Sequence, residues 1–256
     1  MEHFRYGELE VSIGASGDEA GEAAAADFAE AARAAIADRG DIAVILATGN
    51  SQLGFVEALS RRDDVEWDRI TVLHMDEYLG MPADHPASFR RWMRERIVEP
   101  LRPHRFEGLE GDFVPVEEEI ARYEALLRNL APVICVMGIG ENGHLAFNDP
   151  PADFTPDEWV RIVEMDEMSR AQQVGEGHFP SLAETPREAV SLTIPALLAP
   201  GRVIVVAPEG RKARAVQATL EGPITPEVPA SILRTQPQAH LYLDGDSAGR
   251  LDRSKR

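Results

Sequence analysis

Val133-Ile134-Cys135-Val136-Met137 is an apolar run that leads directly into Gly138-Ile139-Gly140-Glu141-Asn142-Gly143-His144-Leu145-Ala146-Phe147-Asn148-Asp149-Pro150. A second apolar run, Ile70 to Leu73, is followed by Met75-Asp76-Glu77-Tyr78-Leu79-Gly80. Short apolar runs of this kind are typical of strands buried in a parallel sheet. In an open α/β sheet, the carboxyl ends of the strands border the crevice that binds ligands. We therefore expect the two polar segments to meet in one pocket, where carboxylates and a histidine can move protons on a small polar substrate.

The rest of the chain alternates between strand and helix patterns. The predicted strands cover residues 42–46, 70–74, 133–137, 189–192, 203–207 and 240–243, and the predicted helices cover residues 18–37, 53–59, 88–97, 118–130 and 211–220. Strands separated by helices of about ten residues form βαβ units. The predicted fold is therefore α/β, with a three-layer, mainly parallel, Rossmann-like sheet flanked by helices. Residues 150–188, rich in Pro, Asp and Glu, are predicted to form a mobile flap over the pocket.

Composition limits the class of protein. With 256 residues, 44% of them hydrophobic, the chain can bury a substantial core, and no repeat or linker divides it, so residues 1–256 are predicted to form a single domain. Cys135 is the only cysteine and the histidines lack metal-ligand spacing, so we expect neither a disulfide framework nor a metal site. No apolar run approaches the roughly 20 residues that span a bilayer, and the N-terminus lacks the pattern of a signal peptide. We expect a soluble cytoplasmic protein that does not bind membranes.

The net charge bears on the partners of the chain. The formal charge is −18, from 26 Lys and Arg against 44 Asp and Glu, and no basic stripe interrupts it. Such a surface keeps a protein soluble and repels a nucleic-acid backbone, so we expect no nucleic-acid partner. An anionic substrate would need local positive groups.

Two strand-to-helix turns could supply those groups. The turn Ala47-Thr48-Gly49-Asn50-Ser51 would place free N–H groups and a hydroxyl at a helix N-terminus, an arrangement that suits a phosphate. Gly and Ser at such a turn can also serve only as helix caps, and both interpretations stay open here. Lys212, in Gly210-Arg211-Lys212, also lies between a strand and a helix. A lysine is mildly unfavourable at a helix start, so its place there favours an anion nearby.

The segment Gly138-x-Gly140-x-x-Gly143 matches the dinucleotide-binding fingerprint only in letters. The true fingerprint opens a long helix, whereas Asn148-Asp149-Pro150-Pro151 interrupts the chain before a helix can form. We therefore expect no nicotinamide cofactor. The glycines are predicted to let the backbone wrap closely around a small substrate.

Three acidic or basic positions stand out as candidates for catalysis. A lone histidine is most often structural, but His144 directly follows the glycine turn and has Asp149 nearby, which favours a functional role. Asp76 and Glu77 follow a strand, where such a pair could also act as turn formers or caps. For Glu77 both interpretations stay open.

At this point the chain resembles a known family. Between about residues 42 and 242 it resembles glucosamine-6-phosphate deaminases, in the superfamily that also holds 6-phosphogluconolactonases. The motifs that carry the resemblance are Thr48-Gly49-Asn50-Ser51, Met75-Asp76-Glu77-Tyr78, His85-Pro86-x-Ser88, Gly143-His144-x-Ala146-Phe147-Asn148, Lys212 and Glu221-Gly222. The forms Asp76-Glu77-Tyr78 and Ala146-Phe147-Asn148 favour the deaminase branch, because the lactonase branch is expected to follow its histidine with a Thr-Ala-Ser-like run.

The resemblance implies a role for each site residue. It implies that Asp76 moves a proton between sugar carbons 2 and 1, and that His144 helps to open the sugar ring with the support of Asn142 and Asp149. It implies a phosphate site made of the first turn and two basic residues, and no cofactor. The residues of that phosphate site are Gly49, Asn50, Ser51, Arg170 and Lys212.

Three features depart from the family pattern. Asn142 stands where the family usually has an acid, and Asp149 stands where it usually has Glu. Residues 155–158 lack the basic pair that, in some members, belongs to an allosteric site for a sugar phosphate. We therefore expect no activation by that route.

The predicted function is the isomerisation and hydrolytic deamination of glucosamine 6-phosphate to fructose 6-phosphate and ammonia, in amino-sugar catabolism. One alternative is a lactonase that uses the same fold and phosphate site. Another is a deaminase or isomerase of a different amino-sugar phosphate, and a third is a sugar-phosphate-sensing module without catalysis. The sequence leaves a homo-oligomer open.

Overall fold

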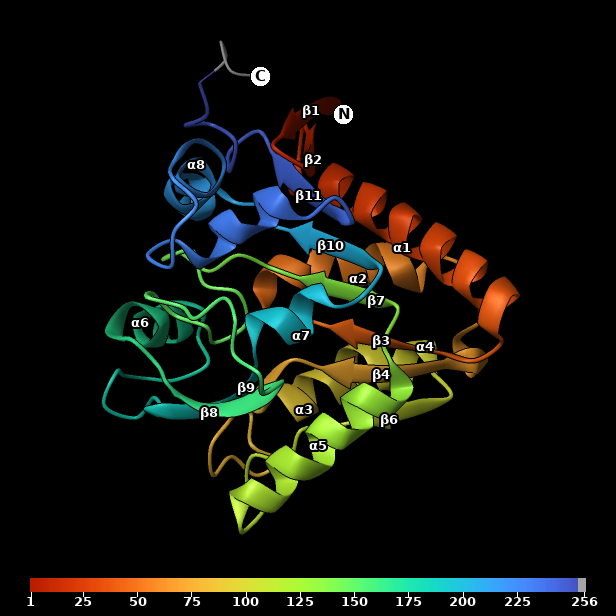
Figure 1. Cartoon of the computed structure of the whole chain (residues 1–256), viewed down its shortest axis with the longest axis vertical. Helices are drawn as coiled ribbons and strands as arrows, with labels where there is room; N and C mark the ends of the chain where they lie inside the picture. Colours follow the sequence, from red (N-terminus) through yellow and green to blue (C-terminus); the bar gives the residue numbers. More distant parts are fainter. Residues whose placement is uncertain (253–256) are drawn as a thin grey trace.

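An eight-stranded sheet forms the centre of the computed structural model, which describes residues 1–252 (Figure 1). Its strand order is β1-β2-β11-β10-β7-β3-β4-β6. The strands are β1 (Glu2–Tyr6), β2 (Leu9–Gly14), β3 (Ile42–Leu46), β4 (Ile70–His74), β6 (Arg105–Glu107), β7 (Ile134–Met137), β10 (Arg202–Val206) and β11 (Ala239–Asp244). Every neighbouring pair is parallel except β1 and β2 at one edge. The α/β, mainly parallel fold is thus confirmed.

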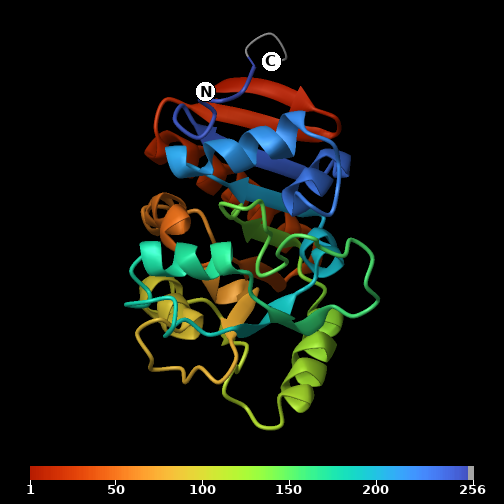
Figure 2. The same ribbon diagram turned by 90° about the vertical axis from the view of Figure 1, so that its left-hand side faces the viewer.

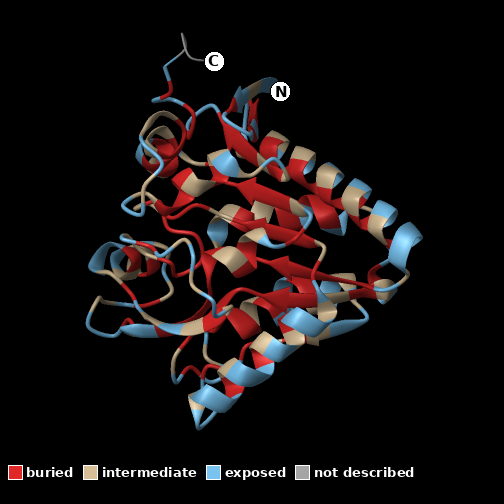
Figure 3. Ribbon diagram, viewed as in Figure 1, coloured by how far each residue is buried: buried red, intermediate tan, exposed pale blue. Residues whose placement is uncertain are grey.

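Helices cover both faces of this sheet, because its strands are apolar on both faces. In β7, Ile134 and Val136 belong to the core beneath α1 (Gly17–Arg39) and α2 (Leu53–Ser60). Cys135 and Met137 point to the opposite core, which α5 (Val116–Leu130), α7 (Ile194–Leu198) and α8 (Ala213–Glu221) cover. Figure 3 shows the strands as a buried layer between these helices. The layers are the three predicted from the sequence.

A second, three-stranded sheet lies beside the first, below α6 in the view of Figure 1. It is antiparallel, in the order β5 (Asp76–Tyr78), β9 (Glu188–Leu192) and β8 (Val160–Glu164). Strand β5 continues the chain from β4 after one residue, so the small sheet begins at the carboxyl end of a central strand. Figure 2 shows the helix α6 (Glu167–Gly175) facing the viewer in front of the central sheet.

The predicted elements lie close to the observed ones, with one irregular helix. Strands β3 and β4 have the predicted bounds, and α1 ends at Gly40, whose N–H donates to the carbonyl of Ile36 at 2.9 Å and whose φ is +86°. The helix predicted over residues 88–97 is α3 (Phe89–Met93) followed by a π-helical turn (Arg94–Val98) and the short α4 (Glu99–Leu101).

Other elements were not predicted. Strands β1, β2, β5, β6 and β8 and helices α6 and α7 have no counterpart in the sequence prediction. Residues 150–188, predicted to form a mobile flap over the pocket, contain β8 and α6. No helix within residues 1–252 combines the length and apolar character needed to cross a membrane.

Candidate active site

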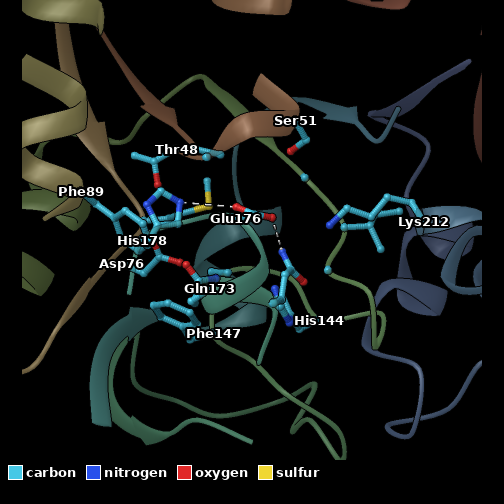
Figure 4. Close-up of a pocket in the computed structure, with 18 residues that line it drawn as sticks. Thr48, Ser51, Asp76, Phe89, His144, Phe147, Gln173, Glu176, His178 and Lys212 are labelled. Atoms are coloured by element: carbon cyan, nitrogen blue, oxygen red, sulfur yellow. Dashed lines mark hydrogen bonds and ion pairs between the residues drawn. The ribbon is translucent and has the colours of Figure 1, made fainter. Parts of the chain in front are cut away.

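One cavity lies where the central strands β3, β4, β7 and β10 end (Figure 4). It encloses about 550 Å³ of empty space, open solvent included. Its lining residues are Ala47, Thr48, Gly49, Ser51, Met75, Asp76, Phe89, Gly138, Ile139, Gly140, His144, Ala146, Phe147, Gln172, Gln173, Glu176, His178 and Lys212. The two polar segments predicted to share a pocket therefore do so.

The predicted anion-binding turns meet on one side of the cavity. Gly49 has φ +97°, which only glycine adopts without strain, and the chain then enters a 3-10 turn and α2. A helix start carries N–H groups without intrahelical partners, and such groups suit an anion. Ser51 and Lys212 line the same cavity, whereas Asn50 is exposed and does not line it. The structure thus brings together the predicted phosphate-binding residues Gly49, Ser51 and Lys212, and leaves Asn50 at the rim.

Lys212 is almost completely buried. Burial, followed by the nearby charge of Arg211, lowers the pKa of its ammonium group to about 8, although acidic neighbours oppose the shift. An anion bound beside it would raise that pKa again, because it favours the charged form. The ammonium group is thus desolvated and suited to bind an anion.

Asp76 lies on the opposite side of the cavity in the view of Figure 4. It is 7% exposed at the start of β5, where pairing with β9 fixes its backbone. Burial, and then repulsion from the Glu77 carboxylate, raise the pKa of the Asp76 carboxyl group to about 8. A carboxylate in apolar surroundings is a stronger base than a solvated one, so Asp76 is suited to remove a weakly acidic proton.

Glu77 has a structural role, which resolves the question that the sequence left open. Its carboxylate accepts hydrogen bonds from the Ser88 hydroxyl at 2.7 Å and from the Arg90 backbone N–H at 3.0 Å. It also lies 3.5 Å from the Arg90 guanidinium. A carboxylate at the first turn of α3 satisfies free N–H groups and favours the helix dipole. Glu77 therefore anchors α3 beneath the cavity and does not line it.

His144 lies against the glycine turn that precedes it. A Cβ atom at Gly140 would lie 2.3 Å from the His144 Nε2 atom, so only glycine leaves room for the ring. The sequence suggested that these glycines wrap around a substrate, but Gly140 makes room for a side chain of the protein itself. The ring nitrogen Nδ1 lies 2.8 Å from the Ser169 hydroxyl oxygen and 3.1 Å from a carboxylate oxygen of Asp149.

Asp149 and Asn142 complete the group around His144. Burial alone would raise the pKa of Asp149, but hydrogen bonds and the charge of His144, with hydrogen bonds from Ser169 and Asn142, lower it to about 2. The Asn142 amide donates to Asp149 at 2.9 Å and its carbonyl oxygen accepts the His144 backbone N–H at 3.0 Å. The four residues predicted as catalytic thus form two groups, Asp76 on one side and His144, Asn142 and Asp149 on the other.

The flap contributes residues that the sequence analysis missed. Gln172, Gln173 and Glu176 of the α6 region, and His178 after it, line the cavity. In the view of Figure 4, Glu176 lies between Asp76 and Lys212. A usable signal was Asp166, a typical N-cap before a run of helix-forming residues, and its side chain caps α6 through the Ser169 N–H.

An ion pair holds this flap against the far side of the cavity. Arg211 donates to Glu176 at 2.8 Å and to Glu141 at 3.1 Å. Burial alone would raise the pKa of Glu176, but the His178 ring, whose Nε2 lies 3.5 Å away, and hydrogen bonds from Arg211 and Gln172 lower it to about 2, so it is ionised. The ion pair joins α6 to the start of α8 across the cavity.

Arg170 does not join the phosphate-binding residues. Its guanidinium donates to the backbone carbonyls of Leu182 and Thr185, the latter at 3.0 Å. It lines a separate surface hollow beside β8 and not the cavity that holds Lys212. In this structure Arg170 therefore ties the flap together and lies apart from Lys212.

The arrangement is typical of an α/β enzyme that acts on a small anionic substrate, because a buried carboxyl group and a histidine share one cavity with a buried lysine. Within residues 1–252 no group of three or more His, Cys, Asp or Glu side chains could hold a metal ion.

Comparison with known proteins gives the family. Residues 15–242 match the family model described as glucosamine-6-phosphate isomerases/6-phosphogluconolactonase, and the chain belongs to this family. It is 35% identical over 218 residues to a glucosamine-6-phosphate deaminase of Exiguobacterium sibiricum, with 82% of each chain covered. It is 31% identical to that of Halothermothrix orenii, covering 80% of this chain and 86% of the relative.

Solved structures agree with this assignment. A structure described as a monomeric glucosamine-6-phosphate deaminase of the NagB superfamily matches with a TM-score of 0.84 and 28% identity, covering 96% of this chain and 99% of that one. A 6-phosphogluconolactonase of Trypanosoma brucei matches with a TM-score of 0.76 and 17% identity, covering 98% of this chain and 100% of that one, which shows a shared fold.

Proposed function

We propose that this protein is a cytoplasmic glucosamine-6-phosphate deaminase, which converts glucosamine 6-phosphate and water to fructose 6-phosphate and ammonia. The observation that carries the proposal is the pairing, in one cavity, of the desolvated base Asp76 with the anion site of Gly49, Ser51 and Lys212. Relatives that share 31–35% of their residues with this chain carry the name of that activity.

The phosphate end orients the substrate. The helix start after Gly49 and the Lys212 ammonium group bind the phosphate on carbon 6, at the end of the cavity away from Asp76. A group held at a distance from the reacting atoms restricts their position and so lowers the entropic cost of the reaction. The same contacts select phosphorylated sugars over free ones.

His144 opens the sugar ring. The Asp149 carboxylate is ionised and can only accept hydrogen bonds, so the Nδ1 atom of His144 that faces it carries a hydrogen. The other ring nitrogen, Nε2, is then left to contact the substrate. Ring opening moves one proton from the hydroxyl on carbon 1 to the ring oxygen. Nε2 can accept this proton from the carbon 1 hydroxyl and deliver it to the ring oxygen, so the histidine ends in the same protonation state as it began.

Asp76 carries out the isomerisation. As a carboxylate it removes the proton from carbon 2, which gives an enolamine, and it returns the proton to carbon 1. The carbon 1 oxygen takes up a proton as the enolamine forms, and the nitrogen gives up a proton when carbon 1 is protonated. The product is a ketimine at carbon 2, and water adds to it and releases ammonia. Carbon 1 is reduced while carbon 2 is oxidised, so the atoms and electrons balance without an external redox partner.

A substrate panel tests the proposal. We expect ammonia and fructose 6-phosphate, in equal amounts, from glucosamine 6-phosphate and much less product from galactosamine 6-phosphate. Hydrolysis of 6-phosphogluconolactone without ammonia release would instead make the chain a lactonase. Turnover of the galactose isomer alone would move the assignment to a different amino-sugar phosphate.

The assembly state is a separate part of the proposal. All the residues assigned above belong to one chain, and the relative with a TM-score of 0.84 is described as monomeric. We propose that one copy of the chain suffices for catalysis, although the sequence leaves a homo-oligomer open. Light scattering and activity measured over the same range of protein concentrations test this: activity per chain that falls as oligomers dissociate would contradict it.

A further inference from the structure

The flap helix α6 reaches the histidine group through two side chains near its start. Ser169 is 1% exposed, and its hydroxyl oxygen lies 2.8 Å from His144 Nδ1. Asp166, the N-cap of α6, accepts a hydrogen bond from the Asn142 amide at 2.8 Å. Asp149 in turn accepts the Asp166 backbone N–H at 2.9 Å, so the helix start and the loop after β7 are bonded to each other.

The number of available hydrogens decides the direction of each bond. The Asp149 carboxylate is ionised and donates nothing. It accepts the Ser169 hydroxyl hydrogen in a short hydrogen bond. Since a serine hydroxyl has one hydrogen, the Ser169 oxygen can only accept at its contact with His144, and Nδ1 must be the donor. Ser169 therefore favours the His144 form with hydrogen on Nδ1.

Asn142 links two carboxylates. Its amide nitrogen has two hydrogens, which go to Asp149 at 2.9 Å and to Asp166 at 2.8 Å, while its oxygen accepts the His144 backbone N–H. A carboxylate at this position would face two others at hydrogen-bond distance. The neutral amide of Asn142 fits because Asp166 supplies a second negative charge from the flap.

We propose that Asp166 and Ser169 are positioning residues for His144, so that docking of α6 holds the ring with its hydrogen on Nδ1 and leaves Nε2 for the substrate. This inference rests on the proposed function, in which Nε2 moves the proton during ring opening. It makes the flap part of the proton-transfer apparatus as well as a cover over the cavity.

A purely structural role for Asp166 predicts a different result. Its second oxygen caps α6 through the Ser169 N–H at 2.6 Å, and Asn is as good an N-cap as Asp. Asp166→Asn therefore keeps the cap but removes the charge. It also leaves one acceptor oxygen for two donors, the Asn142 amide and the Ser169 backbone N–H. If capping were the only role, this variant would behave as the wild type.

The first test needs no substrate. Nitrogen-15 NMR of the histidine rings, with the His144 signal identified by its absence from His144→Gln, should show neutral His144 with hydrogen on Nδ1. A predominant Nε2–H form in the wild type would overturn the proposal. Because this measurement is independent of turnover, it decides the proposal even if glucosamine 6-phosphate is not the substrate.

The second test uses turnover of glucosamine 6-phosphate. Asp166→Asn and Ser169→Ala should each lower kcat by about 10-fold or more, with KM changed by less than about 3-fold, because they act on His144 and not on the phosphate site. The matched control is Glu167→Gln, which removes an exposed carboxylate from the same helix turn and should keep wild-type kcat. In an Asn142→Ala background, Asp166→Asn should have no further effect on kcat.

Either of two kinetic outcomes contradicts the proposal: wild-type kcat in Asp166→Asn, or a full loss that persists in the Asn142→Ala background. Circular dichroism and thermal unfolding of each variant establish that it is folded. If Ser169→Ala does not fold, Asp166→Asn and the NMR measurement still decide.

Discussion

Asp76 and Glu77 are consecutive residues of β5, yet only the Asp76 carboxyl group lines the cavity, while that of Glu77 is buried against the start of α3. Successive side chains of a strand point to opposite faces, which separates these two carboxyl groups. Their charges still interact: burial is the main cause of the raised Asp76 pKa, and the charge of Glu77 is the second. A residue that anchors a helix thus also tunes the proposed base.

This relationship predicts the pH dependence of kcat/KM. The carboxylate form of Asp76 increases as pH rises through about 8, whereas the charged form of Lys212 is lost over the same interval. We expect a narrow bell-shaped profile with its maximum near pH 8. Glu77→Gln should move the acidic limb to lower pH, by on the order of a unit or less, because it removes a repelling charge. An acidic limb that stays in place or moves upward would contradict this role of Glu77.

Lys212→Ala tests the phosphate site. It should raise KM for glucosamine 6-phosphate by roughly 10- to 150-fold, since a charge-assisted contact contributes about 1.5–3 kcal/mol. Activity toward unphosphorylated glucosamine, however low, should change little. Equal losses on both substrates would show that Lys212 is structural.

Arg170→Ala is the matching comparison. The family resemblance implied that Arg170 binds the phosphate, but its guanidinium donates hydrogen bonds to the backbone carbonyls of Leu182 and Thr185 in the flap. We expect a lower melting temperature and similar losses on phosphorylated and free sugar. A loss confined to the phosphorylated sugar would restore the original assignment, with Arg170 moving toward the phosphate when substrate binds.

Burial of Asp76 should cost stability at high pH. The folded-state pKa of about 8 lies above the ordinary value of 3.8, so the favourable neutral form is present at low pH and lost as pH rises through about 8. We therefore compare the free energy of unfolding of Asp76→Asn with that of wild type at each pH. The difference, variant minus wild type, should be larger at pH 9 than at pH 5 by at least about 1 kcal/mol. Urea unfolding at both pH values measures the difference. Asp153→Asn, at an exposed position, is the control and should show a constant difference.

Regulation can also be tested. Residues 155–158 carry no basic pair, so we expect hyperbolic kinetics that N-acetylglucosamine 6-phosphate leaves unchanged. Initial rates over a range of substrate concentrations, with and without this compound, measure it. A sigmoidal curve that becomes hyperbolic on its addition would contradict the prediction.

The sequence predicted those parts of the molecule in which local pattern and burial agree. β3 is a continuous apolar run and β4 is mostly apolar, so their bounds and the position of Asp76 after β4 could be read directly. The Gly49 turn and His144 were found because glycine marks places where backbone or side chains approach closely. These features depend on residues near one another in the chain.

The flap could not be predicted in the same way. Helix α6 has only two buried residues, the polar Ser169 and Gln173, so no apolar periodicity marks it. Its place depends on bonds to distant residues, such as the contact of Ser169 with His144 and that of Glu176 with Arg211. Glu176 and His178 therefore carried no signal as lining residues. The sequence could not show that Arg170 lines a hollow apart from Lys212, because a basic residue near a motif does not reveal which way its side chain points.

The central claim is that Asp76 transfers the proton between carbons 2 and 1 of glucosamine 6-phosphate, and the most direct measurement combines turnover with isotope exchange. Wild-type protein and Asp76→Asn, which preserves shape but removes the base, are incubated with this substrate in deuterium oxide. The account predicts that wild type releases ammonia and fructose 6-phosphate, and that carbon 1 of the product carries the hydrogen from carbon 2 or the solvent deuterium that replaces it on the Asp76 carboxyl group. It predicts that Asp76→Asn loses at least about 10²-fold in kcat and shows no exchange at carbon 2 of recovered substrate. Near-normal turnover or persistent exchange at carbon 2 in Asp76→Asn would contradict it.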